Sequence, residues 1–309
     1  MKPKCFVPDL KLFLHEQFNN FLNKSKRTLI NLEISPCGVC NANCSFCFYG
    51  KNKDKEFLQV EDLLNLLRRA KDGYGLKAIT WTGGGEPTLH TGFDTMIQQV
   101  YFNLGIKQGL FTNALDLPTY DASVFEWIRI SKTDRDWNQD AIRLICAGAE
   151  KVGLCINFVG DEDLDSIAQA ISITERHDAI KYVQVRPALG TNGEESGVKI
   201  TEKLSEYAKE PKVFITDYKF EKANNKDRGY DKCYGYHFVP FLWHNGDFGC
   251  CGYQREIVFG NIYKDSMDDI MNNMPDFVNV RTDCQLCCKN SEINESINKI
   301  VEIEDKDFV

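Results

Sequence analysis

Between residue 29 and about residue 190, short apolar runs alternate with longer segments whose apolar residues recur at helical spacing. The apolar runs predict strands of a parallel sheet, which are hydrophobic on both faces. We expect strands at residues 28–35, 78–81, 106–111, 125–130, 151–159 and 182–185, and helices at residues 59–72, 91–103, 135–148 and 161–176. This alternation predicts about six βαβ units in an α/β domain.

The flanking segments follow other patterns. Residues 9–27 have apolar positions at helical spacing and predict one amphipathic helix packed on the main domain. Residues 190–197 are rich in glycine and polar residues, which is typical of a loop or linker. Beyond it we expect a strand at 212–220, short strands from Cys233 onward, and helices near residues 266–273 and 292–303. The sequence thus predicts three parts: an N-terminal helical extension (1–28), an α/β domain (29–195) and a small α+β cysteine-rich domain (196–309).

Composition narrows the class of protein. No apolar run approaches the ~18 residues of a membrane helix, and no signal-peptide pattern opens the chain, so we expect a cytoplasmic protein with no membrane partner. The formal charge of −8 disfavours a nucleic-acid partner. Thirteen cysteines in such a chain indicate metal or redox chemistry rather than disulfides, and ten of them cluster in residues 37–47, 233–251 and 284–288.

The first cysteine cluster has the spacing of a metal site. Cys40, Cys44 and Cys47 form C-x3-C-x2-C, which places three thiolates on one small loop. Three thiolates can hold three corners of a [4Fe–4S] cubane and leave the fourth iron free for another ligand. A structural zinc knuckle or a group of free thiols is the alternative. Cys37 adds ambiguity, because Cys37-x2-Cys40 is itself a metal-ligand spacing.

A glycine-rich turn follows the strand expected at residues 78–81. Its sequence is Thr82-Gly83-Gly84-Gly85-Glu86-Pro87. Glycines at the end of a strand allow the backbone to approach a ligand closely, and a glutamate carboxylate can accept hydrogen bonds from an ammonium group. The turn is not a phosphate-binding P-loop, because no Lys-Ser/Thr pair follows it.

Together, C-x3-C-x2-C and Gly-Gly-Glu-Pro about forty residues later resemble the signatures of the radical S-adenosylmethionine (radical SAM) enzymes. The resemblance covers residues 29–190 and implies a partial (β/α)6 barrel. It implies that Cys40, Cys44 and Cys47 hold a [4Fe–4S] cluster whose free iron is chelated by S-adenosylmethionine. It also implies an electron donor such as flavodoxin or ferredoxin, and cleavage of the cofactor to a 5′-deoxyadenosyl radical that abstracts hydrogen from a substrate.

The same resemblance suggests further site residues. Phe46 matches the aromatic residue near adenine, and Gly84, Gly85 and Glu86 match the group that holds the methionyl amine. The remaining cofactor candidates are Ser131 at the end of a strand, the Thr112-Asn113 pair and Leu189, with Arg186 as a candidate catalytic residue. In the family a glycine commonly follows the Thr-Asn pair, whereas this chain has Ala114. Ordinary structural roles, such as caps, turns and salt bridges, are the alternative for each.

The later cysteines resemble the start of the C-terminal extension called SPASM. Cys233-x12-Gly246-x4-Cys251 is followed by Cys284-x2-Cys287, too few cysteines for the full extension. The pattern is similar to the shortened form, twitch, which implies one auxiliary [4Fe–4S] cluster on Cys233, Cys251, Cys284 and Cys287. Cys250 or Cys288 could replace a neighbour. A four-cysteine zinc ribbon is the alternative.

These features predict a radical SAM oxidoreductase with two [4Fe–4S] clusters. Four thiolates would saturate the second cluster, so we expect it to accept an electron during dehydrogenase-like chemistry on a small polar molecule. A peptide-modifying enzyme that matures ribosomal peptides is the second hypothesis. The third is a zinc-binding interaction protein without catalytic activity.

Overall fold

The computed structural model describes residues 8–50, 54–188, 202–216, 219–220, 228–284 and 290–303. Three residues named above, Leu189, Cys287 and Cys288, lie outside this part of the chain. None of the helices in the described ranges is both long and apolar enough to cross a membrane.

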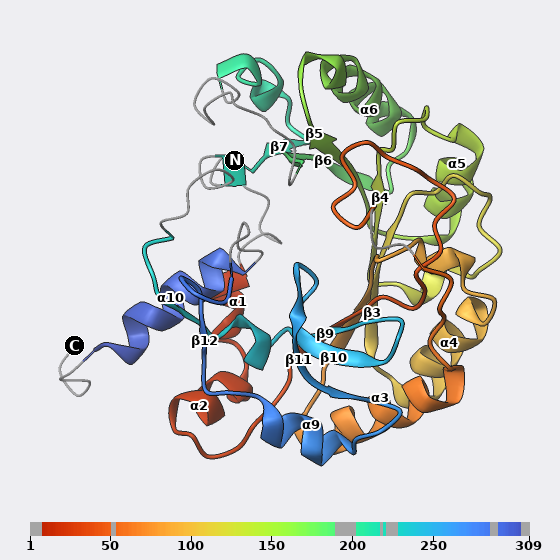
Figure 1. Cartoon of the computed structure of the whole chain (residues 1–309). Helices are drawn as coiled ribbons and strands as arrows, with labels where there is room; N and C mark the ends of the chain where they lie inside the picture. The colour runs from red at the N-terminus through yellow and green to blue at the C-terminus, as the bar shows by residue number, and fades with distance from the viewer. Residues whose placement is uncertain are drawn as a thin grey trace.

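A single sheet of ten strands organises the molecule, in the order β11-β10-β9-β1-β2-β3-β4-β5-β6-β7. Strands β1 to β7 pair in parallel, which confirms the α/β class. Their bounds are Asn31–Ile34 (β1), Ala78–Trp81 (β2), Lys107–Thr112 (β3), Trp127–Ser131 (β4), Val152–Phe158 (β5), Ile180–Pro187 (β6) and Val213–Ile215 (β7). The sheet curves around a central space as an open barrel (Figure 1).

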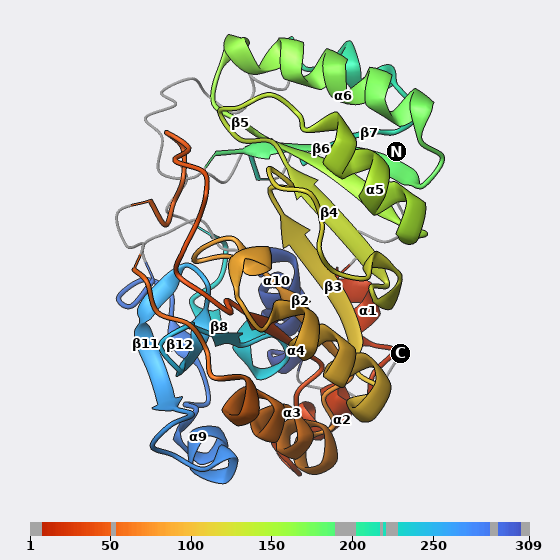
Figure 2. The ribbon, with the colours of Figure 1, turned by 90° about the vertical axis from the view of Figure 1, so that its right-hand side faces the viewer.

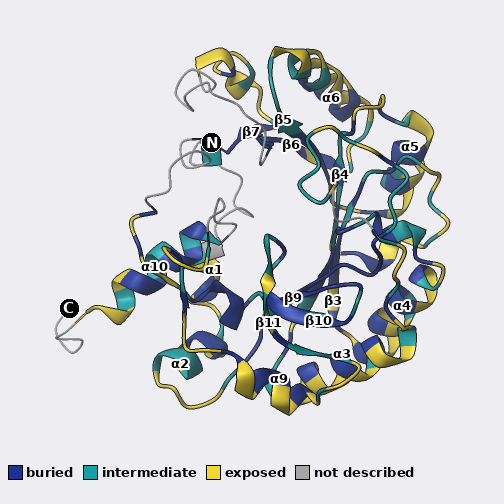
Figure 3. Ribbon diagram, viewed as in Figure 1, coloured by how far each residue is buried: buried dark blue, intermediate teal, exposed yellow. Residues whose placement is uncertain are grey.

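Helices cover the outer face of this sheet (Figure 2). They are α3 (Val60–Tyr74), α4 (Phe93–Gln99), α5 (Gln139–Gly148) and α6 (Leu164–Arg176). In α3 the buried side chains are Leu63, Leu66, Leu67 and Ala70, spaced as one helical face, and Gly75 ends the helix with φ 74°. Shorter turns lie at Pro87–Leu89, Val100–Leu104, Ala122–Val124, Asp161–Asp163, Tyr207–Lys209 and Gly235–His237. Burial is concentrated in the strands and the inner helix faces (Figure 3).

The cysteine-rich C-terminal region continues the same sheet. Strand β9 (Phe241–Leu242) pairs in parallel with β1, and β10 (Asp247–Cys251) and β11 (Gln254–Asn261) follow as antiparallel strands. At the other edge, β7 pairs with β6. Strands β7 and β9–β11, which follow the domain boundary expected at residue 195, therefore lie in the same sheet as β1–β6. They form its two edges.

The rest of the C-terminal region packs beside β9–β11. Strands β8 (Lys232–Cys233) and β12 (Val278–Asn279) form a separate antiparallel pair, and the helices are α9 (Met267–Asn273) and α10 (Ser291–Val301).

The single helix predicted for residues 9–27 is wrong. The structure has two short helices, α1 (Pro8–Leu12) and α2 (Glu16–Leu22). Their buried residues join a small core with Tyr234, Phe238, Ile293 and Ile297 of the C-terminal region. The break turns Leu12 and Phe18 toward this core and leaves Leu14 82% exposed, so the apolar spacing did not mark one continuous buried face.

Candidate functional site

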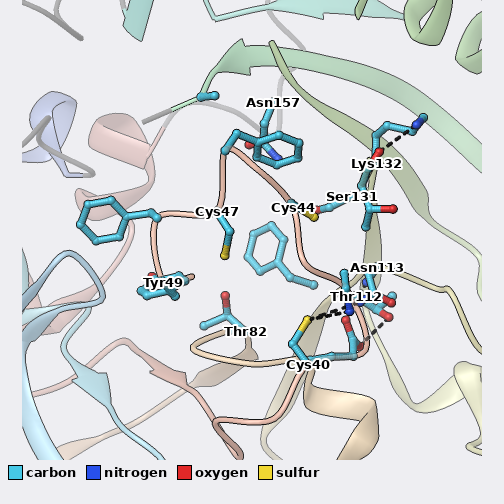
Figure 4. Close-up of a pocket in the computed structure, with 18 of the residues that line it drawn as sticks. Cys40, Cys44, Cys47, Tyr49, Thr82, Thr112, Asn113, Ser131, Lys132 and Asn157 are labelled. Atoms are coloured by element: carbon cyan, nitrogen blue, oxygen red, sulfur yellow. Dashed lines mark hydrogen bonds between the residues drawn. The ribbon is translucent and has the colours of Figure 1, made fainter. Parts of the chain in front are cut away.

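A cavity of about 240 Å³ lies where the parallel strands end, and Cys40, Cys44 and Cys47 line it together. In Figure 4 the three cysteines surround the same space. The other sequence-predicted residues that line it are Phe46, Gly85, Glu86, Thr112, Asn113, Ser131 and Arg186. The carboxyl ends of parallel strands are where α/β proteins bind ligands, so the topology and the motif indicate the same place.

Hydrogen bonds to the sulfur of Cys40 suit a thiolate. The backbone amide of Ala42 donates to Cys40 Sγ at 3.4 Å, and Asn113 Nδ2 approaches the same sulfur at 3.8 Å (Figure 4). Donors to cysteine sulfur stabilise negative charge and tune iron–sulfur clusters. The loop is also held from outside, where Asp134 Oδ2 accepts from the amide of Ser45 at 2.7 Å.

Cys37 has a different role from its three neighbours. It is fully buried, and its thiol donates to the carbonyl oxygen of Glu86 at 3.1 Å. Burial, with the nearby Glu86 carboxylate, raises the pKa of the Cys37 thiol to about 12. A thiol that stays protonated and donates to a carbonyl is a poor metal ligand, so Cys37 joins the cysteine loop to the glycine-rich turn.

The glycines of the turn allow this close packing. A Cβ on Gly85 would lie 2.1 Å from the carbonyl oxygen of Val39, and the amide of Glu86 donates to that same oxygen at 2.7 Å. Gly83 and Gly85 line the cavity, whereas Gly84 faces away from it toward Ser35 and His244. Within the turn, Gly83 and Gly85 therefore present backbone to the cavity beside the three cysteines, and Thr82, Glu86 and Pro87 also line it.

The Glu86 side chain is 3% exposed and its carboxylate is held by protein donors. Oε1 accepts from Thr112 Oγ1 at 2.7 Å, from Thr88 Oγ1 at 2.9 Å and from the Thr88 amide at 3.4 Å, and Oε2 accepts from the Asn113 amide at 2.7 Å. Burial raises the pKa of the Glu86 carboxyl, an effect that these four bonds oppose. The Glu86 carboxylate thus connects the glycine-rich turn to the end of β3.

The Thr112-Asn113 pair lies at that strand end. Asn113 Nδ2 donates to Asn41 Oδ1 at 2.8 Å, and Asn113 Oδ1 accepts from the amide of Leu115 at 2.9 Å. Ala114 has φ 48°, in the left-handed region that glycine adopts most readily. This conformation explains why the resembled family commonly has a glycine at this position. In this chain Ala114 adopts the same conformation.

The wall formed by β4, β5 and β6 is polar. Ser131 ends β4 and Lys132 follows it, and Lys132 Nζ is directed to the backbone carbonyls of Thr133 and Arg135, at 2.8 and 2.6 Å. Arg186 Nε donates to Asn157 Oδ1 at 2.8 Å, and both residues line the cavity. This wall offers a guanidinium and an amide to a polar substrate.

A second group of cysteines lines a separate, smaller cavity. Its described members are Cys233, Cys250, Cys251 and Cys284. Two of them accept hydrogen bonds at sulfur, from Asn294 Nδ2 to Cys233 at 3.3 Å and from Arg228 Nη1 to Cys284 at 3.1 Å. Cys250 is 3% exposed and belongs to the main hydrophobic core, whereas Cys251 is half-buried at the end of β10. Sulfur-directed donors again suit thiolate ligands.

Tyr253 lies between the two groups of cysteines. Cys251 pairs with Gln254, so Gly252 and Tyr253 form a two-residue turn between β10 and β11, and this hairpin reaches into the central space (Figure 1). Tyr253 lines both cysteine cavities. We missed Tyr253, Asn294 and Arg228 in the sequence, because neither a motif nor a periodicity marks them.

The donors that line the first cavity fit an iron–sulfur cluster. Each thiolate of a cubane binds a different iron, so its ligands lie farther apart than those of one zinc ion. The three thiols around one cavity and the donors to Cys40 Sγ are compatible with a [4Fe–4S] cluster.

Comparison with known proteins shows what this region is similar to. Residues 34–132 match the family model "Radical SAM superfamily". No curated protein matches the sequence. Among solved structures, Streptococcus suis SuiB bound to S-adenosylmethionine is similar with a TM-score of 0.63 and 17% identity, covering 83% of this chain and 68% of SuiB.

Two further structures are similar and carry peptides. SuiB bound to its precursor peptide SuiA matches with a TM-score of 0.62 and 16% identity, over 86% of this chain and 71% of SuiB. The protein anSMEcpe, with bound AdoMet and a peptide named Cp18Cys, matches with a TM-score of 0.55 and 16% identity, over 90% of this chain and 84% of anSMEcpe. At these identities the likeness establishes a shared fold.

Proposed function

We propose that this chain is a radical SAM enzyme that holds two [4Fe–4S] clusters. The observation that carries the proposal is the common cavity of Cys40, Cys44 and Cys47 beside the backbone of Gly83 and Gly85. The match of residues 34–132 to the radical SAM model supports it. A cluster on the three cysteines would supply the electron that cleaves S-adenosylmethionine to methionine and a 5′-deoxyadenosyl radical.

The chain's own residues divide into binding and positioning groups. The backbone of Gly83 and Gly85 in the cavity is suited to the methionyl end of the cofactor, and Phe46 and Ser131 complete the lining that the family resemblance assigns to it. Hydrogen bonds of Glu86 with Thr112 and Asn113 fix the position of the glycine-rich turn. A further hydrogen bond from Asn113 to Asn41 fixes the cysteine loop beside it. Leu189 remains a candidate from sequence alone.

For the second cluster we propose Cys233, Cys251, Cys284 and Cys287 as ligands. Support comes from the common cavity of the first three and from the donors Asn294 and Arg228 at their sulfurs. Four thiolates would leave this cluster no iron for substrate, so its role would be electron acceptance. A flavodoxin or ferredoxin would reduce the first cluster.

For the substrate we propose a small polar molecule, supported by the polar wall of the cavity. Asn157 and Arg186 line the cavity and are joined by a hydrogen bond, and their remaining N–H groups would suit a small polar molecule. Loss of a hydrogen atom, then of a proton and an electron, would dehydrogenate that molecule, and the auxiliary cluster would take the electron. Peptide modification is the second candidate, favoured by the peptide complexes of SuiB and anSMEcpe.

The test is an anaerobic assay of 5′-deoxyadenosine with reconstituted, dithionite-reduced protein. We expect the parent to form it and the Cys40→Ala/Cys44→Ala/Cys47→Ala variant to form none. Candidate small molecules and short peptides, added separately, should be distinguished by which of them stimulates 5′-deoxyadenosine formation. Bound zinc, without the visible absorption of iron–sulfur clusters, would refute the proposal in favour of the zinc-binding interaction protein.

A further inference from the structure

A hydrogen-bonded network of three side chains, two of them buried, links three segments that are far apart in the sequence. His244, 1% exposed and just after β9, places its two ring nitrogens 3.2 Å from Ser35 Oγ (Nδ1) and 2.8 Å from Asp54 Oδ2 (Nε2). Ser35 follows β1 and is fully buried. Neither the family motifs nor the proposed ligand sets include any of these three residues.

At one end, this hydrogen-bonded network contacts the glycine-rich turn on the side away from the cysteine cavity. The amide of Gly84 donates to Ser35 Oγ at 3.0 Å, and Ser35 Oγ lies 3.3 Å from the carbonyl oxygen of Cys37, to which it can donate. A Cβ on Gly84 would lie 2.9 Å from Ser35 Oγ and 3.0 Å from His244 Cε1. Gly83 and Gly85 face the cysteine cavity, so Ser35 and His244 brace the opposite side of the same turn.

At its other end, the hydrogen-bonded network contacts the cysteine loop. A Cβ on Gly38 would lie 2.2 Å from Asp54 Oδ1, so the Asp54 carboxylate packs directly on the backbone two residues before Cys40. Partial burial raises the pKa of Asp54, but the hydrogen bonds from His244 and from the Glu56 amide more than offset this, and the net pKa is lowered. Arg255 of β11 lies 3.6 Å from the same carboxylate.

The proton on one ring nitrogen is fixed by this arrangement. An ionised carboxylate only accepts hydrogen bonds, so His244 Nε2 carries a hydrogen and donates to Asp54. Nδ1 then meets the Ser35 hydroxyl, which can both donate and accept. The ring is therefore held in one orientation between two partners, with almost no contact with solvent.

We propose that His244 is a positioning residue for S-adenosylmethionine. Through Ser35 and Asp54 it sets the glycine-rich turn against the cysteine loop, so the C-terminal region serves the cofactor site as well as carrying its own cysteines. The inference rests on the proposed function, because it requires the cavity to bind S-adenosylmethionine. It assigns to His244 an effect on cofactor affinity, exerted through Ser35 and Gly84.

The test measures S-adenosylmethionine affinity of reconstituted protein by equilibrium dialysis. His244→Ala and Ser35→Ala should bind the cofactor about tenfold more weakly, equivalent to ~1.4 kcal/mol, while keeping the parent iron content. His244→Asn keeps a polar group near Ser35 and should recover part of that affinity. His237→Ala is the control, because His237 is also buried in the C-terminal region but its ring contacts the carbonyl oxygen of Asp276 instead.

A second readout separates positioning from general destabilisation. Addition of S-adenosylmethionine should change the electron paramagnetic resonance spectrum of the reduced cluster in the parent and in His237→Ala. In His244→Ala the same spectral change should require about tenfold more S-adenosylmethionine. Parent-like affinity in both His244→Ala and Ser35→Ala, or equal losses in His244→Ala and His237→Ala, would overturn the inference. A parent protein that carries its clusters and binds no S-adenosylmethionine would instead refute the proposed function.

Discussion

Replacing Glu86 separates its structural role from a direct role in cofactor binding. Glu86→Ala removes the acceptor of two donors, the buried Thr112 hydroxyl and the partly buried Asn113 amide, which lie 2.7 Å from the carboxylate. Each buried donor left without a partner costs ~1–3 kcal/mol, so we expect a loss of about 2–6 kcal/mol in the free energy of unfolding. That is a large part of the ~5–15 kcal/mol typical of a folded domain.

The assay is urea unfolding followed by circular dichroism, with S-adenosylmethionine affinity measured in parallel. Glu86→Gln keeps one acceptor oxygen but turns an amide N–H toward the Asn113 amide, so its loss should be intermediate. Glu126→Ala is the control, because Glu126 is 55% exposed and makes a single ion pair with Lys107 at 3.7 Å, worth at most ~1 kcal/mol. If Glu86→Ala unfolds like Glu126→Ala yet loses cofactor affinity, the carboxylate binds the cofactor directly and our structural account of it is wrong.

Three further predictions concern the two cysteine groups and the fold. Gly85→Ala would place a methyl group 2.1 Å from the Val39 carbonyl oxygen and should abolish S-adenosylmethionine binding in the affinity assay, whereas Gly73→Ala, with no atom within 4 Å, should bind like the parent. Cys251→Ala should lose about half of the iron in a colorimetric assay, whereas Cys250→Ala should keep it; the reverse result would make Cys250 the ligand. Burial lowers the pKa of His237 from 6.5 to about 4, so the unfolded chain binds the extra proton between these pH values and stability should fall on acidification. In urea unfolding, the parent should lose up to ~3 kcal/mol more than His237→Gln between pH 6.5 and pH 4, and parallel pH profiles would contradict this.

The hydrophobic pattern predicted the central sheet well, because buried parallel strands are apolar along their whole length. The strand expected at 78–81 has the bounds of β2, and the strands expected at 151–159 and 182–185 overlap β5 and β6. The pattern failed at residues 9–27, where apolar spacing continued through a break between two helices. A periodic pattern of apolar residues does not mark the turn between α1 and α2, where Phe13 and Leu14 are exposed.

The candidate site was predictable where its residues are close in sequence. Cys40, Cys44 and Cys47 share one loop, and their common cavity follows from their spacing. Contacts between distant segments were not predictable, such as His244 with Ser35, 209 residues apart, or Asn294 with Cys233, 61 residues apart. The ambiguity of Cys37 also needed the structure, because its burial and its contact with the Glu86 carbonyl distinguish it from a ligand.

The most direct test of the central claim is electron–nuclear double resonance of the reduced protein with isotopically labelled S-adenosylmethionine. If the cofactor chelates the free iron of a cluster on Cys40, Cys44 and Cys47, ¹⁵N at the methionyl amine and ¹⁷O at the carboxylate should each couple to the cluster. The variant with Cys233, Cys251, Cys284 and Cys287 changed to alanine should keep these couplings if it remains folded. A parent protein that holds the cluster and binds S-adenosylmethionine without either coupling would contradict the account.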